Sequence, residues 1–238
     1  EYEEYEPIVT AMAAMAEGAT PLHPDIRKDN VIVHSHMTMG DSSFTYEEGL
    51  KKAVEAYGAD NIVSMDVEYD TPRISHCHIE LPVSWAYVDT NGKVTIISST
   101  QIPHIVRRCT AQALGIPIGR VRIIKPYIGG GFGNKQDVLY EPLNAFLTTQ
   151  VGGRGVRMEI SREETLGCTR VRHAIELKVK AAARKDGTLV ARKLEAYSNQ
   201  GGYASHAHAI VANSSNEFKQ IYHDEKVLES DAYTVYTN

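Results

Sequence analysis

The amino-acid sequence predicts an α+β fold, in which β-hairpins and helices are mixed without a repeated strand–helix–strand pattern. Residues 62–69 alternate between apolar and polar side chains, the period-two pattern of a half-buried strand. Asn91-Gly92 joins two strand-like runs, and this dipeptide is preferred in tight hairpin turns. With 238 residues and 42% hydrophobic content, the chain is long enough to bury a substantial core.

The helices are predicted from capping signals and apolar periodicity. Thr45 and Glu48 have the spacing of a capping box, in which each side chain accepts a hydrogen bond from the other residue's backbone N–H. Pro142 either lies in the first turn of its helix or kinks it. We expect helices at residues 10–17, about 45–57, 104–114, 137–150 and 209–231.

The strands are predicted from alternation and from turn residues. Lys185-Asp186-Gly187 indicates a second hairpin turn. Residues 25–43 are extended and polar, and we expect a linker over the surface. We expect strands at residues 2–9, 61–69, 80–89, 93–99, 121–127, 155–161, 173–184, 188–198 and 232–238.

Composition argues against several classes of protein. The formal net charge is −5, and no run of Lys or Arg indicates nucleic-acid binding. No apolar stretch reaches the roughly 18 residues that span a bilayer, and no secretion signal is visible. Cys77, Cys109 and Cys168 form no Cys-x-x-Cys pair, so we expect reduced thiols, a cytoplasmic setting and no zinc or iron–sulfur site built by this chain. The chain begins without Met, and we expect a segment of something longer.

A glycine-rich loop lies between the strand at 121–127 and the helix at 137–150. Gly129 to Gly131 and Gly133 bracket a single aromatic residue, Phe132. Glycine loses more backbone entropy on folding than other residues, so this composition indicates positive φ angles or a close approach of the backbone to another group. Backbone N–H groups at such a strand-to-helix junction favour an anionic or oxygen-rich ligand.

Two common nucleotide-binding loops do not match this spacing. A phosphate-binding P-loop requires Ser or Thr after its Lys, but Gln136 follows Lys135. The dinucleotide fingerprint requires a glycine where Asn134 stands. A tight turn without a ligand remains the alternative.

A second motif, Ser98-Ser99-Thr100-Gln101, lies about thirty residues before the loop. Considered alone, Gln101 would be interpreted as an ordinary surface glutamine, although its amide offers two donors and an acceptor. Together, S-S-T-Q and G-G-G-F-G-x-K resemble the molybdenum-cofactor subunit of the xanthine dehydrogenase and aldehyde oxidase family. S-R-E-E at 161–164 and N-Q-G-G-Y-A-S-H at 199–206 also fit, and G-N-K-Q-D is most similar to bacterial xanthine or purine dehydrogenases with separate subunits.

The resemblance covers the whole chain and implies its domain organisation. Residues 1–25, with Y-E-E-Y-E-P-I-V and G-A-T-P-L-H-P, look like the tail of an α/β hammerhead domain. Residues 26–57 would be a linker and connecting helix. Residues 58–238 look like the first part of the molybdopterin-binding domain.

The resemblance also implies a cofactor and a reaction. Molybdopterin, in its cytosine dinucleotide form, holds molybdenum through its dithiolene, and no side chain binds the metal. Gln101 would hydrogen-bond the apical oxo group and the Phe132 N–H a ligand oxygen, with Gly130, Gly131 and Gly133 allowing an approach to about 3 Å. A molybdenum-bound hydroxide would attack an N-heterocycle or aldehyde. Electrons would pass to a [2Fe–2S] subunit and an FAD subunit, in a dimer of heterotrimers, toward NAD.

One position departs from the family pattern. Gln136 stands where xanthine-oxidising members have Glu, and a neutral amide cannot take a proton as a carboxylate can. Gln136 would still contact substrate, but hypoxanthine, nicotinate or another N-heterocycle suits it as well as xanthine. The family's arginine loop and general base would lie beyond Asn238, so this chain has no catalytic residue of its own and should not act alone.

Three His-x-His pairs are an alternative source of metal ligands. Zinc usually has four ligands, and none of the pairs has a third at a recognisable spacing. We expect ordinary strand or loop histidines. The pairs are His34/His36, His76/His78 and His206/His208.

The rival hypothesis is a non-catalytic α+β binding or assembly module whose glycine loop is only a turn. The two hypotheses differ at Gln101 and Phe132. Only the enzyme requires these residues for molybdenum retention.

Overall fold

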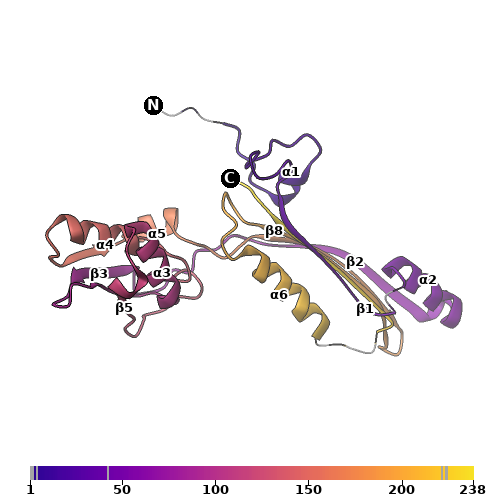
Figure 1. Ribbon diagram of the computed structural model, residues 1–238. Helices are drawn as coiled ribbons and strands as arrows, with labels where there is room; N and C mark the ends of the chain where they lie inside the picture. Colours follow the sequence, from indigo (N-terminus) through magenta and orange to yellow (C-terminus); the bar gives the residue numbers. More distant parts are fainter. Residues whose placement is uncertain (1–2, 4, 42, 221, 223–224) are drawn as a thin grey trace. The chain divides into compact units, whose positions relative to one another are not determined.

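The computed structural model describes residues 3, 5–41, 43–220, 222 and 225–238 (Figure 1). The chain divides into two compact units. Unit 1 comprises residues 1–72 and 173–238, and unit 2 comprises residues 73–172. Among the described residues, no helix is long and apolar enough to cross a membrane.

Unit 1 is built on a five-stranded sheet in the order β1-β9-β8-β7-β2. Its strands are β1 (Val31–Gly40), β2 (Ile62–Thr71), β7 (Ile175–Arg184), β8 (Leu189–Asn199) and β9 (Val227–Val235). β8 and β9 are parallel, and the other neighbours are antiparallel. Helices α1 (Ala11–Met15), α2 (Tyr46–Tyr57) and α6 (Ala207–Gln220) complete the unit, with a short 3-10 helix at Ala59–Asn61.

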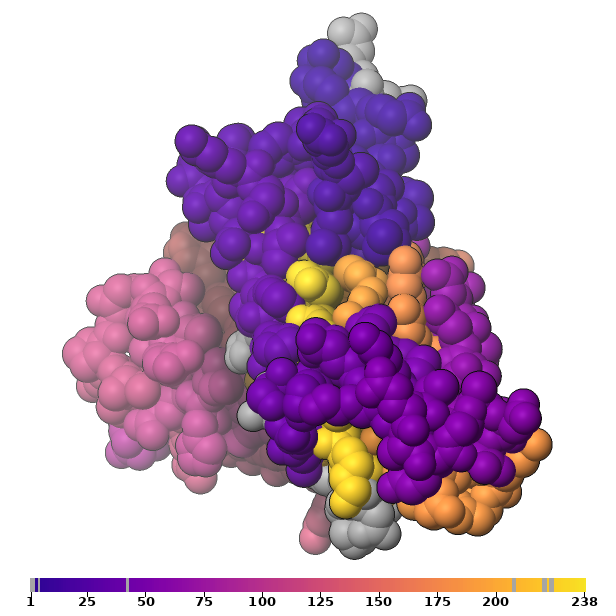
Figure 2. All heavy atoms as spheres, turned by 90° about the vertical axis from the view of Figure 1, so that its right-hand side faces the viewer, coloured from indigo at the N-terminus to yellow at the C-terminus, as the bar shows by residue number. Residues whose placement is uncertain are grey.

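Helices cover both faces of this sheet because its side chains alternate between them. α6 packs on one face, where Val211 contacts a cluster with Leu194 and Ala232. α2 packs on the opposite face through Tyr46 and Ala53. α1 lies on the same face as α2, and Figure 2 shows the indigo N-terminal residues and violet α2 over separate parts of the sheet, with yellow C-terminal residues visible between them.

Unit 2 contains a four-stranded sheet in the order β5-β4-β3-β6. Its strands are β3 (Val83–Val88), β4 (Val94–Ser98), β5 (Val121–Ile124) and β6 (Val156–Glu159), and its helices are α3 (Pro103–Leu114), α4 (Glu141–Gln150) and α5 (Arg162–Cys168), with a 3-10 helix at Ile118–Arg120. β4 and β5 are parallel because α3, which connects them, returns the chain to the end of the sheet at which β4 begins. Ala86, Val94, Ile96 and Ala145 form the core of the unit.

Several local predictions are confirmed. Both capping-box hydrogen bonds of Thr45 and Glu48 are present at the start of α2. The turn at Asn91-Gly92 joins the antiparallel strands β3 and β4, and residues 185–187 join β7 and β8. Pro142 lies in the first turn of α4, where a missing N–H costs nothing.

Other predictions are wrong, and each has a physical reason. The helix expected at 209–231 ends at Gln220, and residues 227–235 form β9, because this segment pairs with β8 and β1 at once. Residues 5–9 are not a strand, and α4 begins at Glu141 instead of residue 137. Residues 31–40 are extended, as expected, but instead of a linker they form β1, an edge strand of the sheet.

Candidate cofactor site

The structure brings Gln101 and the glycine loop together within unit 2. Gln101 follows β4 and the loop follows β5, so both lie near the carboxyl ends of neighbouring parallel strands. The Gly133 N–H donates to Gln101 Oε1 at 3.0 Å. The Gln101 N–H donates to the Lys135 carbonyl oxygen at 2.8 Å. Two motifs thirty residues apart in sequence therefore form one site.

The loop needs glycine for two separate reasons. Gly130 and Gly133 have φ angles of +98° and +96°, in the region that disfavours side chains. At Gly131 the reason is space, because a Cβ there would lie 2.5 Å from Gln101 Oε1. Phe132 is left-handed as well, at φ +51°, and its side chain is 72% exposed. A left-handed conformation costs a non-glycine residue energy, which neighbouring contacts must offset.

Two hydrogen-bond donors at this site have no acceptor among the described residues. Because Gln101 Oε1 accepts from Gly133, the NH₂ group of that amide is left to bind something else. The Phe132 backbone N–H also lacks a partner in the part of the chain that the structure describes. Together they suit oxygen atoms of a ligand.

An ion pair between the buried Lys135 and the partly exposed Glu80 supports the loop. Lys135 is 1% exposed, and its Nζ donates to Glu80 Oε2. The same carboxylate oxygen accepts the Gly129 N–H at 2.9 Å. Burial of Glu80 opposes its charged form, but the hydrogen bonds from Lys135 and Gly129 outweigh burial, so the pKa of Glu80 lies below its usual value. The loop is therefore attached to Glu80 at both of its ends.

A second anchor joins the loop to residues 169–170. His78 is buried, and its Nε2 lies 3.0 Å from Asn134 Oδ1. Asn134 Nδ2 donates to Thr169 Oγ1 at 2.7 Å and to the Arg170 carbonyl at 2.6 Å. The other ring nitrogen of His78 faces the Glu80 carbonyl. Both ring nitrogens of His78 thus lie within hydrogen-bond distance of oxygen atoms.

Several histidine and arginine side chains lie near the residues that hold the loop. Burial, reinforced by the charges of His78 and Arg170, lowers the pKa of His76. Burial also lowers the pKa of Arg170. His76 Nδ1 and Arg162 Nη1 are buried without a hydrogen-bond partner among the described residues. The surroundings of the loop therefore favour an electron-rich ligand.

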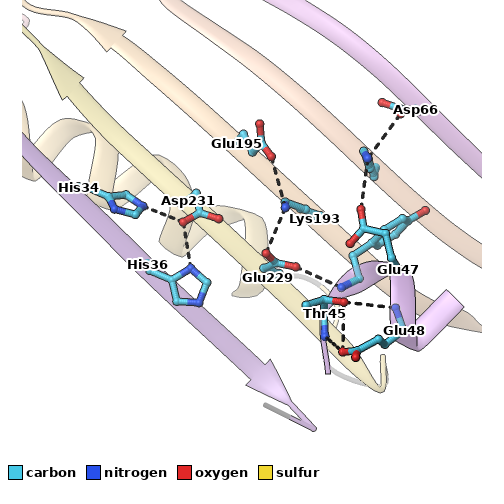
Figure 3. Close-up of polar contacts among 12 residues, drawn as sticks. His34, His36, Thr45, Glu47, Glu48, Asp66, Lys193, Glu195, Glu229 and Asp231 are labelled. Atoms are coloured by element: carbon cyan, nitrogen blue, oxygen red, sulfur yellow. Dashed lines mark hydrogen bonds and ion pairs between the residues drawn. The ribbon is translucent and has the colours of Figure 1, made fainter. Parts of the chain in front are cut away.

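Among the described residues, the histidine pairs are not part of a cluster of three or more metal ligands. In unit 1, His34 Nε2 and His36 Nδ1 lie 2.7 and 2.9 Å from the same oxygen of Asp231 (Figure 3). The described residues contain no group of three His, Cys, Asp or Glu that could hold a metal ion. His206 makes an interaction of its own, and the side chain of His208 lies outside the described part of the chain.

Comparison with known proteins identifies the family. Residues 22–238 match the family described as the molybdopterin cofactor-binding domain, and the chain belongs to it. Over 238 residues it is 42% identical to the putative xanthine dehydrogenase molybdenum-binding subunit of Escherichia coli, covering all of this chain and 30% of the relative. It is 34% identical to the nicotinate dehydrogenase large molybdopterin subunit of Eubacterium barkeri, covering all of this chain and 52% of the relative.

Solved structures agree on the fold. The aldehyde oxidoreductase of Desulfovibrio desulfuricans superposes with a TM-score of 0.84 at 22% identity, covering 99% of this chain and 24% of that one. The α+β class and the family resemblance expected from the sequence are thus confirmed. The chain spans about a third of the length of the E. coli relative.

The sequence motifs led to some of these residues and missed others. Gln101, Gly130, Gly131, Phe132 and Gly133 lie together as expected. Gln136 is half-buried, and its carbonyl faces Arg170 Nη1 at 3.5 Å. The sequence analysis did not predict that Glu80, His78 and Asn134 hold the loop. Asn134 lies in the G-N-K-Q-D motif and His78 in a His-x-His pair, but neither motif indicated this role.

Proposed function

We propose that this chain is the molybdopterin-binding part of a molybdenum hydroxylase that oxidises an N-heterocycle or an aldehyde. The observation that carries the proposal is the contact between Gln101 and the glycine loop. Beside it lie two donors that have no acceptor in the described part of the chain. A turn without a ligand would give no reason for a left-handed, exposed Phe132.

Each residue of the site has a role in this proposal. The Gln101 amide and the Phe132 N–H hold oxygen atoms of the cofactor through hydrogen bonds. Gly130, Gly131 and Gly133 let the backbone come close enough for these bonds. When bound, the molybdenum group supplies Lewis acidity and an activated oxygen.

Gln136 is proposed to orient the substrate next to this site. An amide donates and accepts hydrogen bonds but stays neutral, so it binds a heterocycle without exchanging a proton. Nicotinate-like and purine-like rings both meet that requirement. The relatives include proteins described as nicotinate dehydrogenase and xanthine dehydrogenase subunits, which supports this substrate class.

The wider assembly follows the same proposal. We propose molybdopterin in its cytosine dinucleotide form, a [2Fe–2S] subunit and an FAD subunit as electron acceptors, a dimer of heterotrimers, and a cytoplasmic location. Within the chain, residues 1–25 would end a hammerhead domain, 26–57 would connect, and 58–238 would begin the cofactor domain. The general base would come from elsewhere in a longer subunit.

A glycine substitution tests the proposal with a matched control. Gly131→Ala would place a methyl group 2.5 Å from Gln101 Oε1, whereas a Cβ at Gly119 would meet nothing within 4 Å. In the full-length subunit, Gly131→Ala should lose most of its bound molybdenum and pterin, and Gly119→Ala should keep both. Full retention by Gly131→Ala would mean that the glycine loop does not hold the cofactor, and absence of molybdenum from the unchanged subunit would favour the non-catalytic module.

A further inference from the structure

A groove with a basic lining runs beside the edge strand β5 of unit 2. Its volume is about 320 Å³, and it lies between α3 and β5. Five of its lining residues are basic: Lys93, His104, Arg107, Arg122 and Lys125. The remaining lining residues are apolar, and none is acidic.

The positive charge of this groove is not balanced within the described part of the chain. None of its Lys and Arg side chains has a carboxylate partner within ion-pair distance there, although the chain as a whole has a net charge of −5. Arg107 is fixed in place, since its Nε donates to the carbonyl oxygens of Ile118 and Val121 at 3.2 and 2.9 Å. Like charges held at one place repel, and an anionic partner removes that cost.

The backbone of β5 adds a second requirement. β5 is the end strand of its sheet and pairs with β4 alone, so its outer edge has backbone groups without strand partners. Of the two apolar β5 residues that line the groove, Ile123 is partly exposed, whereas the Val121 side chain is buried. A partner strand with alternating acidic and apolar residues would satisfy charge, backbone and apolar surface together.

We propose that the groove binds an extended acidic segment of a protein partner, which adds as a strand to the edge of β5. Its carboxylates would lie against Arg122, Lys125 and Lys93. Its apolar side chains would lie against the partly exposed Ile123. This site does not depend on the cofactor, so it can be tested apart from the proposed function.

The test uses the 238-residue chain and a fluorescein-labelled peptide of four Glu-Val repeats. Fluorescence anisotropy at about 50 mM salt should show binding that weakens as the salt concentration rises. Arg122→Glu with Lys125→Glu should weaken binding by at least about tenfold. Arg73→Glu with Arg154→Glu makes the same change in net charge on exposed residues of unit 2 outside the groove, and should leave affinity near that of the unchanged chain.

A second peptide separates strand addition from simple charge attraction. N-methylation at alternate residues keeps every carboxylate but removes N–H donors, and it should weaken binding by about tenfold. Equal loss in both double variants, equal binding of the methylated peptide, or equal competition by a DNA duplex would overturn the proposal. Absence of binding would also overturn it, and the cations would then only protect the strand edge.

Discussion

Replacing Lys135 with Met should destabilise unit 2 strongly. The change keeps the length of the side chain but removes the only cation paired with Glu80 in the described structure. The Lys135 side chain is 1% exposed and that of Glu80 is 30% exposed. Removing one member of a buried ion pair costs roughly 3–5 kcal/mol. Because Glu80 is partly exposed and keeps its bond from Gly129, we expect about 3 kcal/mol.

The assay can report on unit 2 alone. Trp85 is the single tryptophan of the chain and lies in β3. Its fluorescence during urea unfolding therefore follows unit 2 even if the two units unfold separately. With a slope near 2 kcal/mol per molar urea, the midpoint should fall by about 1.5 M.

Two controls make this prediction specific. Lys125→Met removes an exposed lysine without an ion pair and should change stability by less than about 0.5 kcal/mol. Adding Glu80→Gln to Lys135→Met should recover about 1–2 kcal/mol, because no unpaired charge is left. A cost for Lys135→Met equal to that of Lys125→Met would refute the supporting role of the pair.

Three further predictions concern pH, a helix cap and the substrate. Burial of Asp231 opposes its ionisation, but hydrogen bonds from His34 and His36 lower its pKa overall, so its contribution to stability is present above the unfolded value and is lost as pH falls through the folded value. Asp231→Asn should flatten the acid limb of unfolding followed by circular dichroism, and an unchanged limb would contradict this. Thr45→Ala should cost about 1 kcal/mol in the same assay, and no loss would argue against the capping box. Gln136→Glu in the full-length enzyme should change the ratio of kcat/KM between purine and nicotinate, whereas an unchanged ratio would remove Gln136 from the substrate pocket.

Local signals predicted much of the fold. A capping box or an Asn-Gly turn works through neighbouring residues, so Thr45 and Asn91 could be interpreted from the sequence alone. The strand expected at 232–238 overlaps the second part of β9, but residues 227–231 were expected to be helical. Their strand state comes from pairing with β8 and β1, which are distant in sequence. Residues 31–40 were interpreted as part of a polar linker although half of them are apolar, and their pairing with β9 makes them a strand.

Some residues of the candidate site could be predicted from the sequence and others could not. The glycine loop and Gln101 were predicted because their motifs are dense and specific. Glu80 and His78 stand about fifty residues before the loop. His78 was noted only as a member of a His-x-His pair, so only the folded chain reveals that these two residues hold the loop. The buried state of Lys135 was equally invisible, since a lysine in a loop is usually exposed.

Molybdenum content tests the central claim most directly. Gln101→Glu keeps an oxygen for the Gly133 N–H but removes the NH₂ donor, and Gln112→Glu makes the same charge change at an exposed position of α3. Elemental analysis of the full-length subunit should give about one molybdenum per chain for the unchanged and Gln112→Glu proteins, and far less for Gln101→Glu. Full molybdenum in Gln101→Glu, or none in the unchanged protein, would contradict the assignment of this site.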